Sequence, residues 1–145
     1  MNPFPPPPRQ GKQEMTGWRD LQLSERRRQW GYNCPSCDID LCIVNEYDHG
    51  IVRGLIEFKR ETAKDDYERS MNCAAMLNLA ARAVLPFFVI RYARDFSWYE
   101  VRPLNDLAKT FVPQNTRMCE RDFVELLYAI HGQQMPEGLQ FWPDV

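Results

Sequence analysis

The sequence contains no hydrophobic run long enough to cross a membrane. A transmembrane helix needs about 20 predominantly apolar residues, and the apolar stretches here are far shorter. The first residues, MNPFPPPPRQGKQEM, are rich in proline and lack the apolar core of a signal peptide. Both absences argue against a membrane-embedded or secreted protein, and we expect the chain to work in the cytoplasm.

The cysteines do not form the pattern of a disulfide scaffold. They number five, an odd count, and are scattered along the chain, whereas small disulfide-rich domains carry even numbers. This usage favours a reducing compartment. Cys34 and Cys37 form one CxxC, which is half a zinc site, and no second CxxC or HxxxH follows. The sequence therefore does not favour zinc at these two cysteines.

The chain also lacks the overall basic excess of many nucleic-acid-binding domains. Its net charge is −2. Residues 1–30 are locally basic, with six basic against three acidic residues, and Arg26, Arg27 and Arg28 are consecutive there. This run is a candidate contact for phosphate groups, and an ordinary solvated helix face explains it equally well.

Length and composition indicate one globular domain. The 145 residues are enough for a hydrophobic core, and 44% hydrophobic with 26% charged residues is usual for such a domain. Four consecutive prolines favour an extended polyproline II conformation near the N-terminus. We expect a disordered proline-rich arm over residues 1–15 and a single domain over residues 16–145.

The central feature of the sequence is a hairpin pattern over residues 38–59, DIDLCIVNEYDHGIVRGLIEFK. Two arms rich in β-branched and apolar residues flank a polar break that ends in glycine, which is the composition of a hairpin turn. Side chains two residues apart in a strand point to the same face. Asp38 and Asp40 therefore share a face of the first arm, and Glu57 and Lys59 share a face of the second.

The register of this hairpin decides whether the charged groups meet. With a two-residue turn at positions 48–49, Asp40 lies opposite Glu57, and Asp38 lies opposite Lys59. A turn one residue longer would place Asp40 and Glu57 on opposite faces unless a bulge corrected the shift. We expect the register that brings the two carboxylates and the ammonium group together.

The rest of the chain alternates helices and strands, which predicts an α/β fold with a mixed central sheet flanked by helices. We expect a helix over 18–30, a helix that ends near 85, a strand over 87–92, an edge strand over 97–102, a short helix over 104–109 and a last helix over 116–131. The second helix should bury the stripe Tyr67, Met71, Ala74, Leu77, Ala81 and Leu85. A long helix between two strands predicts a crossover that makes the strands parallel.

This arrangement resembles the PD-(D/E)xK nuclease superfamily. The resemblance covers about residues 24–105 and rests on Asp40, the strand and turn after it, and Glu57-Phe58-Lys59 as the ExK element. The DID triplet before an apolar strand is also similar to small phage-encoded proteins of this class, and it favours Asp40 as the metal ligand. The proline that often precedes this aspartate is missing here. The resemblance implies a restriction-endonuclease-like core in the order α-β-β-β-α-β, with one further strand ahead of the hairpin.

The resemblance also implies Mg²⁺ or Mn²⁺ as cofactor and DNA as substrate. Asp40, Glu57 and the backbone carbonyl of Phe58 would hold the cation, since hard cations prefer oxygen ligands. Lys59 would orient the attacking water or stabilise the charged transition state. Asp38 would be a further metal ligand or a partner for Lys59.

Three outlying residues complete the candidate site. An acid of the first helix often lies beside the metal in this superfamily, and Glu25, on the same helix face as Trp18, is the matching candidate. Alternatively, Ser24 caps a shorter helix and Glu25 lies in its first turn. Arg60 and Lys64, which follow the ExK element, are candidate phosphate contacts or ordinary solvated side chains.

An ordinary structural explanation also exists, because strands often carry acids on a solvated face and lysine commonly pairs with a neighbouring glutamate. Two functions therefore stand side by side. One is a metal-dependent endo- or exodeoxyribonuclease, and the other is a non-catalytic phage or bacterial interaction protein on the same fold that binds DNA or a host protein. A zinc-stabilised adaptor is a third. The C-terminal GLQFWPDV would pack on the body of the chain or on a second copy in a homodimer.

Overall fold

The structure is a computed structural model that describes residues 22, 26, 29, 39–45 and 50–143. The chain divides into two units, Met1–Ser36 and Cys37–Val145, and the sheet and helices discussed below belong to the second unit. The expected proline-rich arm, and the strand expected ahead of the hairpin, lie outside the described residues. No helix among the described residues is long and apolar enough to span a membrane.

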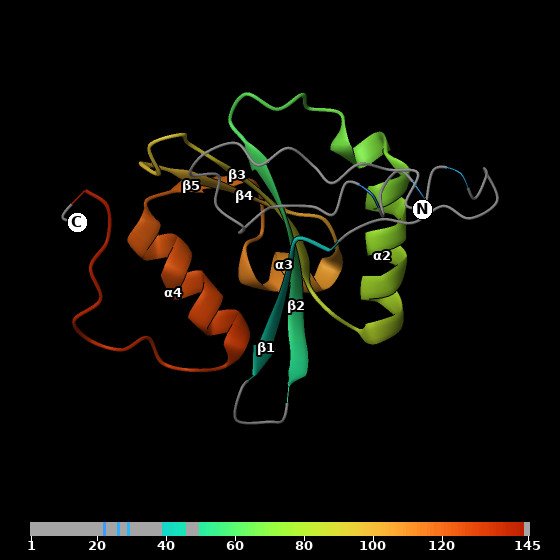
Figure 1. Cartoon of the computed structure of the whole chain (residues 1–145). Helices are drawn as coiled ribbons and strands as arrows, with labels where there is room; N and C mark the ends of the chain where they lie inside the picture. The colour runs from blue at the N-terminus through green and yellow to red at the C-terminus, as the bar shows by residue number, and fades with distance from the viewer. Residues whose placement is uncertain (1–21, 23–25, 27–28, 30–38, 46–49, 144–145) are drawn as a thin grey trace. The chain divides into compact units, whose positions relative to one another are not determined.

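A five-stranded mixed sheet forms the centre of the second unit (Figure 1). Its strands are β1 (Leu41–Asn45), β2 (Ile51–Arg60), β3 (Phe87–Tyr92), β4 (Tyr99–Pro103) and β5 (Thr116–Met118). They lie side by side in chain order, and β2 and β3 are parallel while the other neighbouring pairs are antiparallel. The predicted α/β class with a mixed sheet is therefore confirmed, as is the parallel pairing of the strand of Glu57 with the strand over 87–92.

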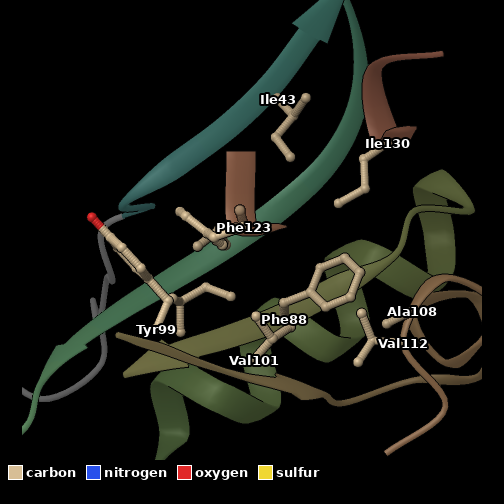
Figure 2. Packing of buried hydrophobic residues seen from close by; sticks show 10 residues of the cluster. Ile43, Phe88, Tyr99, Val101, Ala108, Val112, Phe123 and Ile130 are labelled. Carbon is tan, nitrogen blue, oxygen red and sulfur yellow. The ribbon is translucent and has the colours of Figure 1, made fainter. Parts of the chain in front are cut away.

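Helices cover both faces of the sheet. The crossover between β2 and β3 contains the 3-10 turn η2 (Tyr67–Arg69) and α2 (Met71–Ala83), which packs on one face. The opposite face carries α3 (Asp106–Phe111) and α4 (Glu120–His131), and Figure 1 shows α2 and α4 on the two sides of the strands. Figure 2 shows the core on the α4 side, where Phe123 and Ile130 of α4 meet Ile43, Phe88 and Tyr99 from the strands.

The hairpin register explains how the charged residues of β1 and β2 come together. Near the turn, Asn45 pairs with Ile51, which is one residue off the expected register. A bulge between Ile43 and Val44 restores it, so that Leu41 pairs with Ile56. Continued by one residue, this register places Asp40 opposite Glu57. The expected facing pair is reached by way of a bulge, and the expected turn at positions 48–49 lies outside the described residues.

The crossover helix ends near residue 85 as expected, but the face that it buries differs in part from the predicted one. Ser70 caps it, since the Ser70 hydroxyl accepts a hydrogen bond from the Cys73 N–H at 3.1 Å. Its buried residues are Cys73, Met76 and Ala80, whereas Met71 is 55% exposed. Of the predicted stripe, Tyr67 and Leu85 are buried and Leu77 is partly buried against the same core. The prediction is wrong for Met71, Ala74 and Ala81, which are exposed.

The C-terminal part of the sheet also differs from expectation. β4 is an inner strand, because β5 pairs with it antiparallel through Val101 and Thr116. The residues of β5 were expected to begin the last helix, but α4 begins only at Glu120. As expected, α4 ends at Gly132, whose φ of 73° suits glycine at a helix end. The C-terminal segment packs back on α4, where the Arg121 guanidinium lies 4.7 Å from the centre of the buried Phe141 ring.

Candidate active site

The candidate site lies on the α2 face of the sheet, beyond the part of β2 that α2 covers. Leu55 is buried in the core beneath α2, and side chains two and four residues further along β2 project from the same face. These are Glu57 and Lys59. Asp40 lies just before β1, opposite Glu57 in the register. The structure thus brings together the three residues that the sequence predicted as catalytic.

Asp40 is fixed by the backbone of the neighbouring strand. Its Oδ2 accepts a hydrogen bond from the Phe58 N–H at 2.9 Å. β1 begins only at Leu41, so the Asp40 carboxylate accepts a hydrogen bond from a backbone N–H of β2 that lies past the end of β1. The side chain is itself exposed, which leaves the carboxylate open to solvent and to a ligand.

Glu57 is the buried acid of the site. The residue is 5% exposed, and among the described residues it is the buried charged one. Its Oε1 lies 2.9 Å from the Lys59 Nζ. Its Oε2 is buried and has no hydrogen-bond partner among the described residues. A buried carboxylate oxygen without a donor is costly, so this oxygen is ready to take a cation or a proton.

Burial raises the pKa of the Glu57 carboxyl above its usual value. The Lys59 ammonium group opposes this shift, and the nearby Asp40 carboxylate adds to it. Asp40 lies opposite Glu57 when the register of β1 and β2 is continued by one residue. Two like charges in one place favour a shared positive partner, and one ammonium group does not neutralise both.

Lys59 is held between Glu57 and an aromatic ring. Its Nζ lies 4.8 Å from the centre of the Tyr67 ring, which is within cation–π range. Tyr67 is itself fixed, because its hydroxyl donates to the Asn72 Oδ1 at 2.9 Å. The Lys59 side chain is 28% exposed. The ammonium group is therefore oriented by its neighbours and still accessible from solvent.

The backbone carbonyl of Phe58 lies on the same side as Asp40. An extended residue directs its N–H and C=O toward the same neighbouring strand. The N–H groups of Leu55 and Glu61 bond to β3-side carbonyls, whereas the Phe58 N–H bonds to Asp40. The Phe58 carbonyl therefore faces the β1 side of β2, past the end of β1, which is the side on which Asp40 lies.

These oxygens suit a hard divalent cation. Mg²⁺ keeps several waters and needs only one or two protein carboxylates, and Asp40, Glu57 and the Phe58 carbonyl offer that set. Within residues 39–45 and 50–143, no group of three or more His, Cys, Asp or Glu side chains is placed to hold a metal. The set fits Mg²⁺ or Mn²⁺ with a water-rich shell, and it does not fit the closed four-ligand site of structural zinc.

A network of charged side chains borders Lys59, and the sequence pattern did not predict it. A cavity of about 10 Å³, room for about one water, is lined by Lys59, Asp65, Tyr67, Glu68, Val89, Arg91, Glu100 and Arg102. Arg102 bonds to Glu68 at 2.8 Å and to Asp65 at 3.2 Å. Arg91 donates to the Ala63 carbonyl at 2.7 Å. The one signal in the sequence was Arg91 itself, a charge that interrupts the apolar run of β3 in register with Lys59.

The remaining predicted residues lie elsewhere or cannot be placed. Arg60 leaves β2 on the face opposite Lys59, because successive strand residues alternate, and it lines a hollow with Tyr92. Lys64 is exposed in the loop before η2. Arg26 belongs to the other unit, where its carbonyl accepts a bond from the Gln29 N–H at 3.0 Å. Residues that lie outside the described part of the chain are Glu25, Arg27, Arg28, Cys34, Cys37 and Asp38.

Comparison of the chain with family models, with curated proteins and with solved structures finds no match. The function is therefore argued from the geometry of Asp40, Glu57 and Lys59.

Proposed function

We propose that the chain is a metal-dependent nuclease that hydrolyses DNA phosphodiester bonds. The observation that carries this proposal is the buried Glu57 Oε2, which has no donor among the described residues, on a residue that faces a second acid, Asp40, across the hairpin. Sheet stability alone gives no reason to bury a carboxylate in this way, because the uncompensated group costs free energy. A cation held between the two acids removes that cost.

Each group has a distinct role in this proposal. Asp40, Glu57 and the Phe58 carbonyl would hold Mg²⁺ or Mn²⁺. When bound, the cation would act as a Lewis acid toward the phosphodiester and lower the pKa of water. The chain prepares the site by fixing Asp40 on the Phe58 N–H and by packing Glu57 into the sheet. Such fixed ligands need little reorganisation during the reaction.

Lys59 would act on the phosphate. A lysine ammonium group has three donors, and its bond to Glu57 uses one of them. The remaining donors are available to a phosphate oxygen or to the attacking water, because the side chain is partly exposed. The Tyr67 ring limits the positions that Nζ can take. Lys59 would thus stabilise negative charge that builds up in the transition state.

The topology supports the same proposal. We infer a restriction-endonuclease-like core, in which a hairpin, a crossover helix and a parallel strand carry the site. The order β1-β2-α2-β3 has these parts, with Asp40 and Glu57 on adjacent strands of the hairpin. The interaction-protein alternative remains a separate hypothesis, and the absence of a third acid among the described residues is the observation that favours it.

The test is a cleavage assay on closed circular duplex, linear duplex and single-stranded DNA, with Mg²⁺ or Mn²⁺ and with EDTA. The parent is compared with Lys59→Ala and with Lys109→Ala, a control in which an α3 lysine outside the site is changed. We expect cation-dependent cutting that falls at least about a hundredfold in Lys59→Ala, with DNA binding retained. Cutting that survives in Lys59→Ala contradicts the role of Lys59. Parent protein that cuts none of these substrates with either cation supports the interaction protein instead.

A further inference from the structure

The turn between β3 and β4, residues 93–98, presents aromatic rings at the end of the sheet. Phe96 is 50% exposed. Its ring stacks on that of Tyr92, with centroids 6.0 Å apart and planes 9° apart. The Phe96 ring thus offers a flat apolar surface to solvent, and the Tyr92 ring packs against its other face.

The backbone holds Phe96 in this exposed position. Its φ is 62°, a region that bulky residues rarely adopt and that is found at functional sites. The turn is closed by several bonds. The Phe96 N–H bonds to the carbonyl three residues earlier at 2.9 Å, and the Asp95 carboxylate accepts from the Ser97 N–H at 3.0 Å. The Glu61 carboxylate accepts from the Arg94 N–H at 3.3 Å.

Two guanidinium groups accompany the stacked rings. Arg60 and Arg94 line a hollow of about 440 Å³ together with Tyr92 and Phe96. Among the described residues, neither guanidinium group takes part in an ion pair. The acids beside them, Glu61 and Asp95, are engaged with backbone N–H groups. Glu61 also lines the hollow and keeps its negative charge, so the two guanidinium groups leave an excess of one positive charge beside the apolar ring faces.

A second ring and cation lie on the other side of the same turn. The Arg117 guanidinium lies 3.8 Å from the centre of the Trp98 ring. Trp98 and Arg94 line an adjoining hollow of about 530 Å³. Aromatic and basic groups thus occur together across the turn, with Glu61 and Asp95 between them, and rings beside cations are what a surface uses to stack on bases and contact phosphates.

This surface lies at the same end of β2 as the candidate active site, on the opposite face of the sheet. Tyr92 pairs with Arg60 across β2 and β3, and the preceding pair is Arg91 with Lys59. The aromatic surface thus begins one residue beyond Lys59, at the same end of the two parallel strands. A strand bound at the turn would therefore pass around this end of the sheet for its backbone to reach Asp40 and Glu57.

We propose that the turn 93–98, with Tyr92, Arg60 and Arg117, is a stacking platform for single-stranded DNA. The proposal rests on the proposed nuclease function and names its substrate form. A duplex keeps its bases stacked on one another, so an exposed ring such as Phe96 gains little from it, whereas unpaired bases stack on any aromatic face. Arg60 and Arg94, which form no ion pair among the described residues, would follow the phosphates, and Arg117 is paired with Glu100 at 3.5 Å.

The test measures binding without cutting, in EDTA, by fluorescence anisotropy. The probes are a labelled single strand of about 20 nucleotides and the matching duplex. The variants are Phe96→Asn, which removes the ring and tolerates the positive φ, and Arg94→Gln. Matched controls are Phe111→Ala, another partly exposed phenylalanine, and Arg82→Gln on the exposed side of α2.

We expect the parent to bind the single strand more tightly than the duplex. Phe96→Asn should raise the Kd for the single strand about tenfold, and Arg94→Gln should reduce the slope of log affinity against log salt by about 0.7. The controls should stay within about twofold of the parent. If Phe96→Asn does not fold, the salt slope of Arg94→Gln decides.

The outcomes separate the platform from the nuclease. If the parent cuts DNA but binds the single strand no better than the duplex, the platform alone is overturned. The same holds if the parent cuts DNA and Phe96→Asn binds the single strand as tightly as the control variants do. A parent that does not cut but binds the single strand through Phe96 and Arg94 overturns the nuclease and supports the platform as a binding site. A parent that binds neither probe overturns the platform, and the rings then suit a protein partner.

Discussion

The Phe58 N–H donates a hydrogen bond to the Asp40 carboxylate at 2.9 Å, across the open end of the hairpin. One side chain thus has two functions, since it takes a donor past the end of β1 and places a negative charge opposite Glu57. The bulge between Ile43 and Val44 makes this alignment possible. The candidate site is therefore a consequence of the register of two strands.

The two functions of Asp40 are separable by substitution. Asp40→Asn keeps an acceptor for the Phe58 N–H and removes the charge, whereas Asp40→Ala removes both. We expect Mn²⁺ affinity to fall similarly in both variants, because the ligand charge is lost in each. The unfolding free energy should fall by about 1 kcal/mol only in Asp40→Ala. Denaturant unfolding and calorimetry measure the two effects, and Mn²⁺ binding by Asp40→Asn at parental affinity would contradict the assignment.

The raised pKa of Glu57 predicts a specific pH dependence of stability. The folded protein binds this proton more tightly than the unfolded chain does, so the contribution of Glu57 to stability is present at low pH. It is lost as pH rises from the unfolded value, near 4.5, through the higher folded value. Glu57→Gln should lack this decline.

The measurement is urea unfolding of the parent and of Glu57→Gln between pH 4 and pH 8 without metal. The difference in unfolding free energy between the two should change steadily across this range, in favour of Glu57→Gln as pH rises. Other carboxyl groups titrate in both proteins and cancel in the difference. A constant difference would show that Glu57 titrates at its ordinary value.

Tyr67 positions Lys59 by the face of its ring, so its hydroxyl and its ring should contribute differently. Tyr67→Phe loses the bond to Asn72 but keeps the ring, whereas Tyr67→Leu loses the cation–π contact of about 0.5–1 kcal/mol. We expect the rate of DNA cutting at saturating substrate to fall several-fold more in Tyr67→Leu than in Tyr67→Phe. Melting temperatures of both variants serve as the control for folding. Equal losses of rate at equal stability would assign Tyr67 a purely structural role.

Gly54 allows β2 to approach α4 closely. A Cβ at this position would lie 3.1 Å from the Ile130 Cγ2 and 3.5 Å from the Ile43 Cδ1. We expect Gly54→Ala to cost about 1 kcal/mol and Gly54→Val more, because the branched side chain overpacks the α4 face. Thermal unfolding should show a graded loss in melting temperature. Gly50→Ala is no equivalent control because φ there is 81°. Parental stability of Gly54→Val would contradict this packing.

Local patterns in the sequence predicted the elements that carry the site. The alternation around the ExK element predicts β2, and the apolar run before Arg91 predicts β3, which is buried over its first four residues. The α2 crossover fixes their parallel pairing. The position of Asp40 opposite Glu57 was also predicted, but for a regular hairpin without a bulge. The alternation of apolar and polar residues does not reveal the bulge between Ile43 and Val44.

The errors arise where tertiary contacts decide. β5 has only three residues and forms by pairing with β4. The local sequence of Thr116 to Met118 is equally compatible with the first turn of a helix. The predicted apolar stripe of the crossover helix starts at Tyr67, which lies in the separate turn η2. The residues that α2 buries are therefore offset from the predicted ones. The contacts of Lys59 with Tyr67, and of Arg102 with Glu68, join residues that no local spacing relates.

The most direct test of the central claim is a calorimetric titration with Mn²⁺, without DNA and then with it. The parent is compared with a Glu57→Ala variant whose thermal stability has been matched to the parent by choice of conditions. The account predicts one Mn²⁺ site in the parent that is absent from Glu57→Ala, because Asp40 alone then remains as a charged ligand. The absence of Mn²⁺ binding from both proteins, or equal binding by both, would contradict a metal site between Asp40 and Glu57.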